Sequence, residues 1–172
     1  MDTSGIIYPQ ARGYYLFTAI ARNHGLDRVN QFLQAFSDAR PSVIAAGIAA
    51  EPGWLNLEGW TAATVAQALP QLLARSPVDF TLADLQPITP TQLKTLWFEF
   101  VYCDLAYGDE LMSRAQCEQL WQQLYGLFEG AIELFINRVD NSWCSTLFCT
   151  FDITIVAFSP DLIVILSFGD ED

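Results

Sequence analysis

The chain has 172 residues, of which 52% are hydrophobic and 16% are charged, against about 25% charged in an average globular protein. Residues 1–78 carry five Arg and five acids, so the net charge of −12 lies entirely in residues 79–172, which carry 15 acids against Lys94, Arg114 and Arg138. The aromatic content argues against a disordered chain, and the scarcity of cations argues against direct binding to nucleic acid.

The first half of the chain contains three apolar stretches that predict helices. Residues 1–9 are expected to form a loose lead-in, and residues 10–23 are apolar on nearly all sides, which is typical of a central helix. Residues 27–36 carry their apolar side chains on one helical stripe. The Ala-rich residues 42–50 predict a short helix whose small side chains would let another backbone approach closely.

Residues 59–75 predict a longer helix, in which Pro70 should produce a kink or a split. A connector follows over residues 76–88, because Pro77 and Pro87 disfavour regular structure there. We expect a single turn in it at residues 82–85.

Two later helices have clear starts. Thr89 and Ser113 each precede a Gln by three positions, which is a capping box, and Pro90 occupies the favoured first helical position. After Ser113 the apolar residues follow helical spacing as far as Val139. The pattern therefore predicts one helix of about 26 residues with a broad apolar face.

The C-terminal region changes to β-branched and aromatic residues. Residues 147–158 and 162–168 read as two strands, and Ser159-Pro160-Asp161 reads as the turn between them. This predicts an antiparallel β-hairpin within residues 143–169. The second strand is apolar on both faces, so it requires cover on two sides. Residues 170–172 are expected to form an acidic tail.

Together these features predict a single domain over residues 1–172 of the α+β class. It would be mainly helical, with about six helices in residues 10–140 and the hairpin packed on them. The longest apolar stretch, residues 153–168, is shorter than the roughly 20 residues that span a bilayer. We therefore expect a cytoplasmic protein without membrane insertion.

The sequence contains no cofactor motif and no recognisable metal site. His24 is the single histidine, which excludes sites built from two histidines. Cys144 and Cys149 lack a second cysteine pair of metal-ligand spacing, so we expect all four cysteines to be reduced structural thiols. No pattern of nucleophile and base indicates a catalytic residue.

Carboxylates concentrate around the end of the helix that begins after Thr89. Glu99 lies in its most apolar part and would have a raised pKa if it were buried without a partner. Asp104, Asp109 and Glu110 follow within a few residues. A solvated or salt-bridged cluster explains this pattern best, and the alternatives are a general acid and a site for a hard cation.

We expect partner binding through acidic side chains together with two tryptophans of the 54–60 loop, although such tryptophans more often anchor a loop on the core. The candidate residues are Asp104, Asp109, Glu110, Glu118, Glu129, Glu133, Trp54 and Trp60.

The function that fits best is a small acidic, non-enzymatic accessory protein that binds a protein with a basic surface, such as an assembly factor, adaptor, inhibitor or immunity-type protein. One alternative is an enzyme or small-molecule binder with an apolar pocket anchored by Glu99 and Asp104. Another is an acidic mimic of nucleic acid. The apolar excess also favours a homodimer through the hairpin or the long helix.

Overall fold

The computed structural model describes residues 6–7, 10–11, 14–15, 18–19, 25–40, 44–50, 59–74, 76–139, 142–147 and 149–170. Within them the chain forms four α-helices and one short 3₁₀ turn, η1. They are α1 (Gly25–Ala39), α2 (Ala62–Leu72), η1 (Leu82–Asp84), α3 (Pro90–Phe100) and α4 (Arg114–Tyr125).

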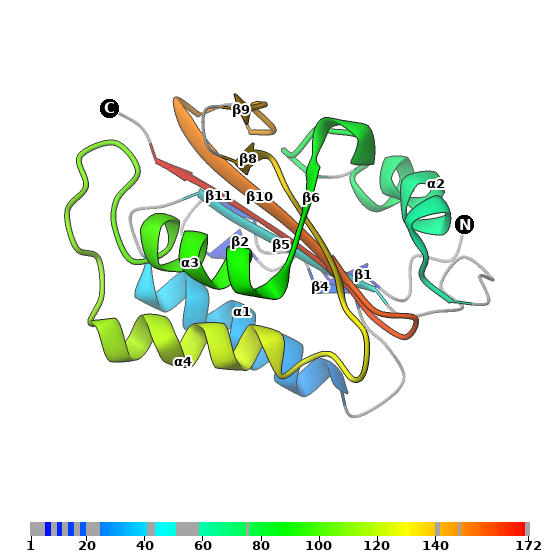
Figure 1. Cartoon of the computed structure of the whole chain (residues 1–172), viewed down its shortest axis with the longest axis horizontal. Helices are drawn as coiled ribbons and strands as arrows, with labels where there is room; N and C mark the ends of the chain where they lie inside the picture. The colour runs from blue at the N-terminus through cyan, green and yellow to red at the C-terminus, as the bar shows by residue number, and fades with distance from the viewer. Residues whose placement is uncertain are drawn as a thin grey trace.

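The centre of the fold is a five-stranded antiparallel sheet in the order β5-β11-β10-β7-β6. Figure 1 shows it crossing the molecule diagonally. Its strands are β5 (Ile44–Ala50), β6 (Gln86–Ile88), β7 (Glu133–Ile136), β10 (Phe151–Phe158) and β11 (Ile163–Asp170).

Three pairs of two-residue strands accompany the sheet. β1 pairs with β4, β2 pairs with β3, and β8 pairs with β9. Their bounds are Ile6–Ile7 (β1), Gln10–Ala11 (β2), Tyr14–Tyr15 (β3), Thr18–Ala19 (β4), Arg138–Val139 (β8) and Ser142–Trp143 (β9).

Helices cover both faces of the sheet. On one face, α1, α3 and α4 form a core with Ile153, Ile155 and Leu166 of the central strands. On the other face, α2 and the segment around η1 pack against Val156 and Ile165. This arrangement confirms the α+β class, the C-terminal hairpin and its two-sided cover.

The expectation of about six helices was wrong. Residues 42–50 contribute the strand β5, which pairs with β11 over seven residues from Ile44 to Ala50. A Cβ at Gly47 would collide with Cδ2 of Leu33, so α1 lies directly on this strand. The absence of a side chain at Gly47 permits this close approach, but pairing with β11 overrides the helical propensity of the segment.

The predicted helix over residues 10–23 was also wrong, since the described residues there belong to the short strands β2, β3 and β4. An apolar run has no periodicity that separates a buried helix from strands. The lead-in of residues 1–9 includes the paired strand β1, and its other residues lie outside the described part.

The predicted 26-residue helix ends after 12 residues, at Tyr125. Gly126 caps it, and a Cβ at Gly126 would approach the carbonyl oxygen of Gln122 to 2.9 Å. Gly130 then adopts a φ of +78°, which suits glycine. The apolar residues that follow form β7, where Leu134 and Ile136 enter the core from a strand.

The sequence-based starts of α3 and α4 are confirmed. The side chain of Thr89 accepts a hydrogen bond from the backbone N–H of Gln92, and the side chain of Ser113 accepts one from that of Gln116. In each pair the side-chain oxygen of Gln in turn accepts from the backbone N–H of the cap residue. The helix expected over residues 59–75 is present in shorter form as α2, with Pro70 inside it, and η1 lies at the expected turn. The connector expected over residues 76–88 was wrong at its end, where β6 pairs with β7. Among the described helices, none has the length and apolarity needed to cross a bilayer.

We predict that Gly47→Val lowers the free energy of unfolding by about 1–3 kcal/mol, because its side chain would collide with Leu33 in a filled core. Valine favours strands, so a loss cannot come from strand propensity. In urea unfolding, Gly47→Val combined with Leu33→Ala should cost less than the sum of the two single changes. Full additivity would show that α1 does not lie on β5 at this position.

Candidate interaction surface

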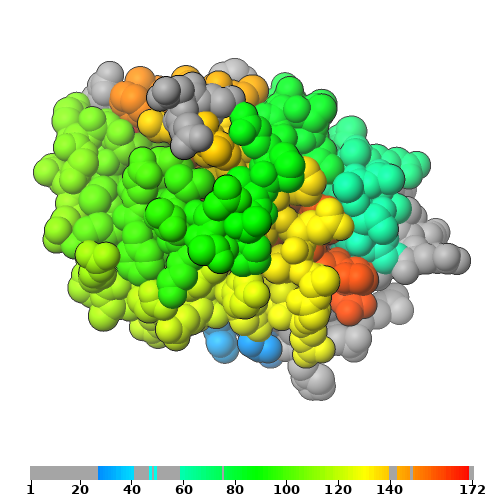
Figure 2. Space-filling model, in the orientation of Figure 1, coloured from blue at the N-terminus to red at the C-terminus, as the bar shows by residue number. Residues whose placement is uncertain are grey.

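The connection between α3 and α4, residues 101–113, is here called the acidic loop. It contains Asp104, Asp109 and Glu110, three of the acids that the sequence indicated. Figure 1 shows it projecting beyond the end of α3, and in Figure 2 it forms one margin of the face covered by α3 and α4. Within the loop, Asp109 and Glu110 are exposed and Asp104 is partly buried.

Asp104 organises the tip of this loop. Its Oδ1 accepts hydrogen bonds from the backbone amides of Ala106 and Tyr107, each 2.8 Å long. Its carbonyl oxygen accepts from the amide of Gly108 at 2.9 Å, and Gly108 adopts a φ of +76° that closes the turn. Tyr107, at this turn, is 69% exposed.

The two sides of the loop pair with each other. Cys103 and Glu110 form an antiparallel bridge, and the amide of Asp104 donates to the carbonyl oxygen of Asp109 at 2.8 Å. A hydrogen bond with Glu110 raises the pKa of the Tyr102 hydroxyl. These bonds order the backbone, while the side chains of Asp109 and Glu110 stay exposed.

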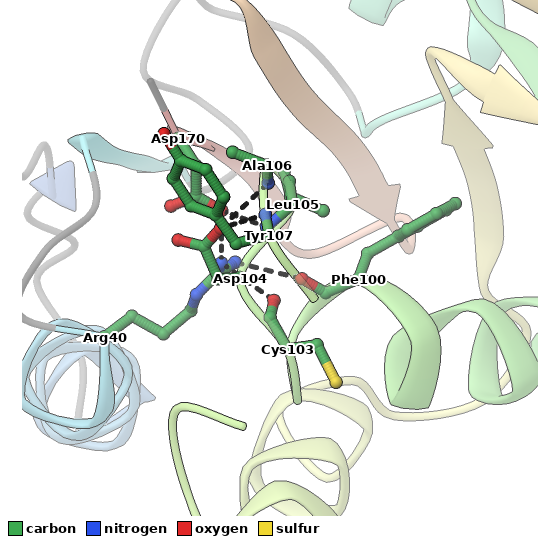
Figure 3. A network of polar contacts seen from close by, with 8 residues as sticks. All are labelled: Arg40, Phe100, Cys103, Asp104, Leu105, Ala106, Tyr107 and Asp170. Carbon is green, nitrogen blue, oxygen red and sulfur yellow. Dashed lines mark hydrogen bonds and ion pairs between the residues drawn. The ribbon is translucent and has the colours of Figure 1, made fainter. Parts of the chain in front are cut away.

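A buried ion pair fastens the loop to the rest of the fold (Figure 3). Nη2 of Arg40, the residue after α1, lies 2.8 Å from Oδ2 of Asp170 at the end of β11. The same carboxylate oxygen accepts the amide of Leu105 at 2.6 Å. One carboxylate thus connects α1, β11 and the acidic loop.

Arg40 makes further contacts with the backbone that leads into the loop. Nη1 donates to the carbonyl oxygen of Phe100 at 3.0 Å, and Nη2 donates to that of Cys103 at 3.2 Å. Burial lowers the pKa of Arg40 and raises the pKa of Asp170, and each charge partly offsets the effect on the other. The expectation of an acidic tail over residues 170–172 was wrong at Asp170, which is the last residue of β11 and only 3% exposed. Residues 171–172 lie outside the described part.

A second buried carboxylate fastens the segment after β9. Oδ2 of Asp152 accepts the amides of Thr146 and Leu147 and the hydroxyl of Thr146, and Oδ1 accepts the indole N–H of Trp143 at 3.1 Å. A chain of hydroxyl groups continues from Thr146 through Thr154 to Ser167. Trp143 is held by this anchor although 46% of it is exposed.

The structure brings together only part of the predicted partner-binding set. Asp104, Asp109 and Glu110 share the acidic loop, whereas Glu118 lies on α4 and pairs with Lys94 at 3.0 Å. Glu129 and Glu133 are exposed but lie beyond the end of α4, so they do not share a helix with Glu118.

The remaining predicted residues do not extend this surface. Trp60 is buried against the core that contains α2, in agreement with a loop anchor, and Trp54 lies outside the described residues. Glu99 is exposed on α3, so it does not anchor a buried pocket. Asp104 uses one oxygen to hold the loop backbone.

The cations of the described chain are all engaged within the fold. Arg28 donates to the Gly126 carbonyl oxygen, Arg40 is buried, Lys94 pairs with Glu118, and the guanidinium groups of Arg114 and Arg138 lie over the rings of Phe98 and Phe100. Among the described acids, only Asp170 and Glu118 form ion pairs. Exposed acids such as Asp109 and Glu110 form no ion pair with a described cation and retain their negative charge.

Three features of the structure were not identified from the sequence. Tyr107 precedes the turn signal Gly108-Asp109, which indicates an exposed position. Asp152 interrupts an apolar strand, which is a signal for a buried polar anchor. The pairing of Arg40 with Asp170 joins positions 130 residues apart, and no local pattern connects them.

The described residues include no group of three or more His, Cys, Asp and Glu side chains that could hold a metal ion. Comparisons with protein-family models, curated proteins and solved structures found no match to this chain. The arrangement itself is therefore the basis for a functional proposal.

We predict that Arg40→Met lowers the free energy of unfolding by about 3–5 kcal/mol, because it leaves Asp170 as a buried charge without its partner. Replacing both residues, as Arg40→Met with Asp170→Leu, should restore part of the loss because no buried charge remains. Urea unfolding of the two variants provides the measurement. A single variant as stable as the wild type would contradict the buried ion pair.

The cysteines should differ in reactivity. Burial raises the pKa of Cys117 to about 11, so only about one thiol in a thousand would be ionised at pH 8. In the native protein, iodoacetamide should therefore label the partly exposed Cys144 well before Cys117. Mass spectrometry of digested samples measures the order, and labelling after denaturation controls for intrinsic reactivity. Equal labelling rates in the native state would refute this order.

Proposed function

We propose that this chain is a small acidic accessory protein that binds a basic protein partner through the acidic loop. The observation that carries the proposal is Tyr107, which is 69% exposed and lies beside exposed Asp109 and Glu110 on a backbone held by the Arg40–Asp170 pair. Tyrosine is enriched among the residues that dominate binding energy at interfaces. A loop already held in place loses little conformational entropy on binding.

The charge distribution supports a basic partner. Asp109 and Glu110 form no ion pair with a described cation, so a lysine- or arginine-rich surface would meet carboxylates that are not already paired. Such complementarity mainly raises the association rate and weakens as salt screens the charges. The aromatic ring of Tyr107 would supply contact area and a face for a cationic side chain.

The alternative of a pocket anchored by Glu99 and Asp104 has less support. Glu99 is exposed, and Asp104 accepts two backbone amides of its own loop. The binding role therefore fits the geometry better than an enzymatic one.

The test is a pull-down from lysate at low and high salt, followed by association rates with the identified partner. We expect one stoichiometric partner whose association slows as salt rises. Tyr107→Ser should weaken binding by at least about tenfold, as for a residue that contributes 1.4 kcal/mol or more. Asp109→Asn combined with Glu110→Gln should mainly slow association.

The matched control is Asp79→Asn combined with Asp161→Asn, which removes the same charge from exposed positions. Asp161 lies in the turn between β10 and β11, at the opposite end of the sheet from the acidic loop (Figure 1). Binding that responds equally to both double variants would show that net charge acts without this loop. Recovery of the bait alone at both salt concentrations would reject the proposal.

A further inference from the structure

The carboxylate of Asp170 is incompletely bonded. Its Oδ2 accepts from Arg40 and from the Leu105 amide, whereas Oδ1 is buried and has no hydrogen-bond partner. Asp152 differs, because both of its oxygens accept hydrogen bonds. An ionised oxygen that is buried without a donor is unfavourable, and a proton placed on Oδ1 removes this cost.

The surrounding charges favour the same proton. The charged and titratable groups that face the pair within the described residues are Arg40 after α1, and Asp104 and Cys103 in the acidic loop. Burial raises the pKa of the Cys103 thiol, which leaves it neutral. The single positive charge of Arg40 therefore interacts with two carboxylates, those of Asp170 and Asp104. When both are ionised, these three side chains together carry a net charge of −1.

We propose that Asp170 is a proton-uptake site that couples the attachment of the acidic loop to pH. A proton on Oδ1 leaves Oδ2 in place to accept from Arg40 and Leu105, so the ties to the loop persist while the charge excess disappears. Arg40 then has Asp104 as its remaining counter-charge. The effect on partner binding rests on the proposed function, whereas the proton uptake does not.

The direction of the pH effect follows from linkage. Burial is the largest influence on Asp170 and raises its pKa above the value expected in an opened, solvated loop. The closed loop then binds the proton more tightly than the open loop, so closure is favoured at low pH. This advantage declines as the pH rises through the pKa of Asp170 in the closed state.

The experiment uses the full chain without a partner. Carbon-13 NMR titration of the Asp170 carboxyl group should give a pKa above that of an ordinary aspartate. Amide protection factors of Leu105, Ala106 and Tyr107, which correct for intrinsic exchange, should rise as the pH falls. The protection factors should change by about tenfold for each unit by which the pKa of Asp170 in the closed loop exceeds its pKa in the open loop. An ordinary or lower pKa, or protection that falls with acid, would overturn the proposal.

Asp104→Asn is the matched variant, because the amide oxygen of Asn can still accept from Ala106 and Tyr107 while the negative charge is removed. It should lower the pKa of Asp170, and an unchanged pKa would refute the shared charge. Asp170→Asn should abolish the pH dependence of the three amides. If Asp170→Asn does not fold, the wild-type and Asp104→Asn titrations still decide the outcome. Loss of partner binding alone would reject the proposed function and leave this result intact.

Discussion

Every layer of this protein is arranged around the two central strands β10 and β11, which pair over eight residues from Phe151–Asp170 to Phe158–Ile163. From Asp152 to Phe158 and from Ile163 to Asp170 every residue is buried. Apolar side chains on both faces of a strand must be covered on both sides. One cover therefore consists of α1, α3 and α4, and the other of α2 and the segment around η1.

Two aspartates of these strands hold the surface segments. Asp170, at the last position of β11, connects to Arg40 and the acidic loop, and Asp152, in β10, connects to the segment after β9. A buried carboxylate is unfavourable unless hydrogen bonds or a counter-charge compensate it. Hydrogen bonds to both oxygens compensate Asp152. Asp170 depends on its ion pair with Arg40, and its Oδ1 is buried without a hydrogen-bond partner. The two anchors therefore differ in their response to protons.

The function that we propose follows from this division between core and surface. Among the described acids of residues 79–172, Asp152 and Asp170 are buried and Glu118 pairs with Lys94, whereas exposed acids such as Asp109 and Glu110 form no ion pair with a described cation. The acidic loop combines these exposed acids with an exposed tyrosine and a backbone held at its base and tip. A rigid, acidic and aromatic surface of this kind is suited to a basic protein partner.

The sequence by itself determined the α+β class, the capped starts of α3 and α4, the C-terminal hairpin and the acidic character of the second half. These features depend on residues close together in the chain, such as Thr89 with Gln92 and Ser113 with Gln116. Local hydrogen bonds and alternation along a strand are visible in sequence order.

Only the tertiary structure decided that residues 44–50 and 133–136 are strands, because pairing with β11 and β10 outweighs their local helical pattern. It also decided which acids share a surface and which are separated, since that depends on where α4 ends. The Arg40–Asp170 pair belongs to the same category: it joins residues 130 positions apart, and the burial that determines its chemistry exists only in the folded chain.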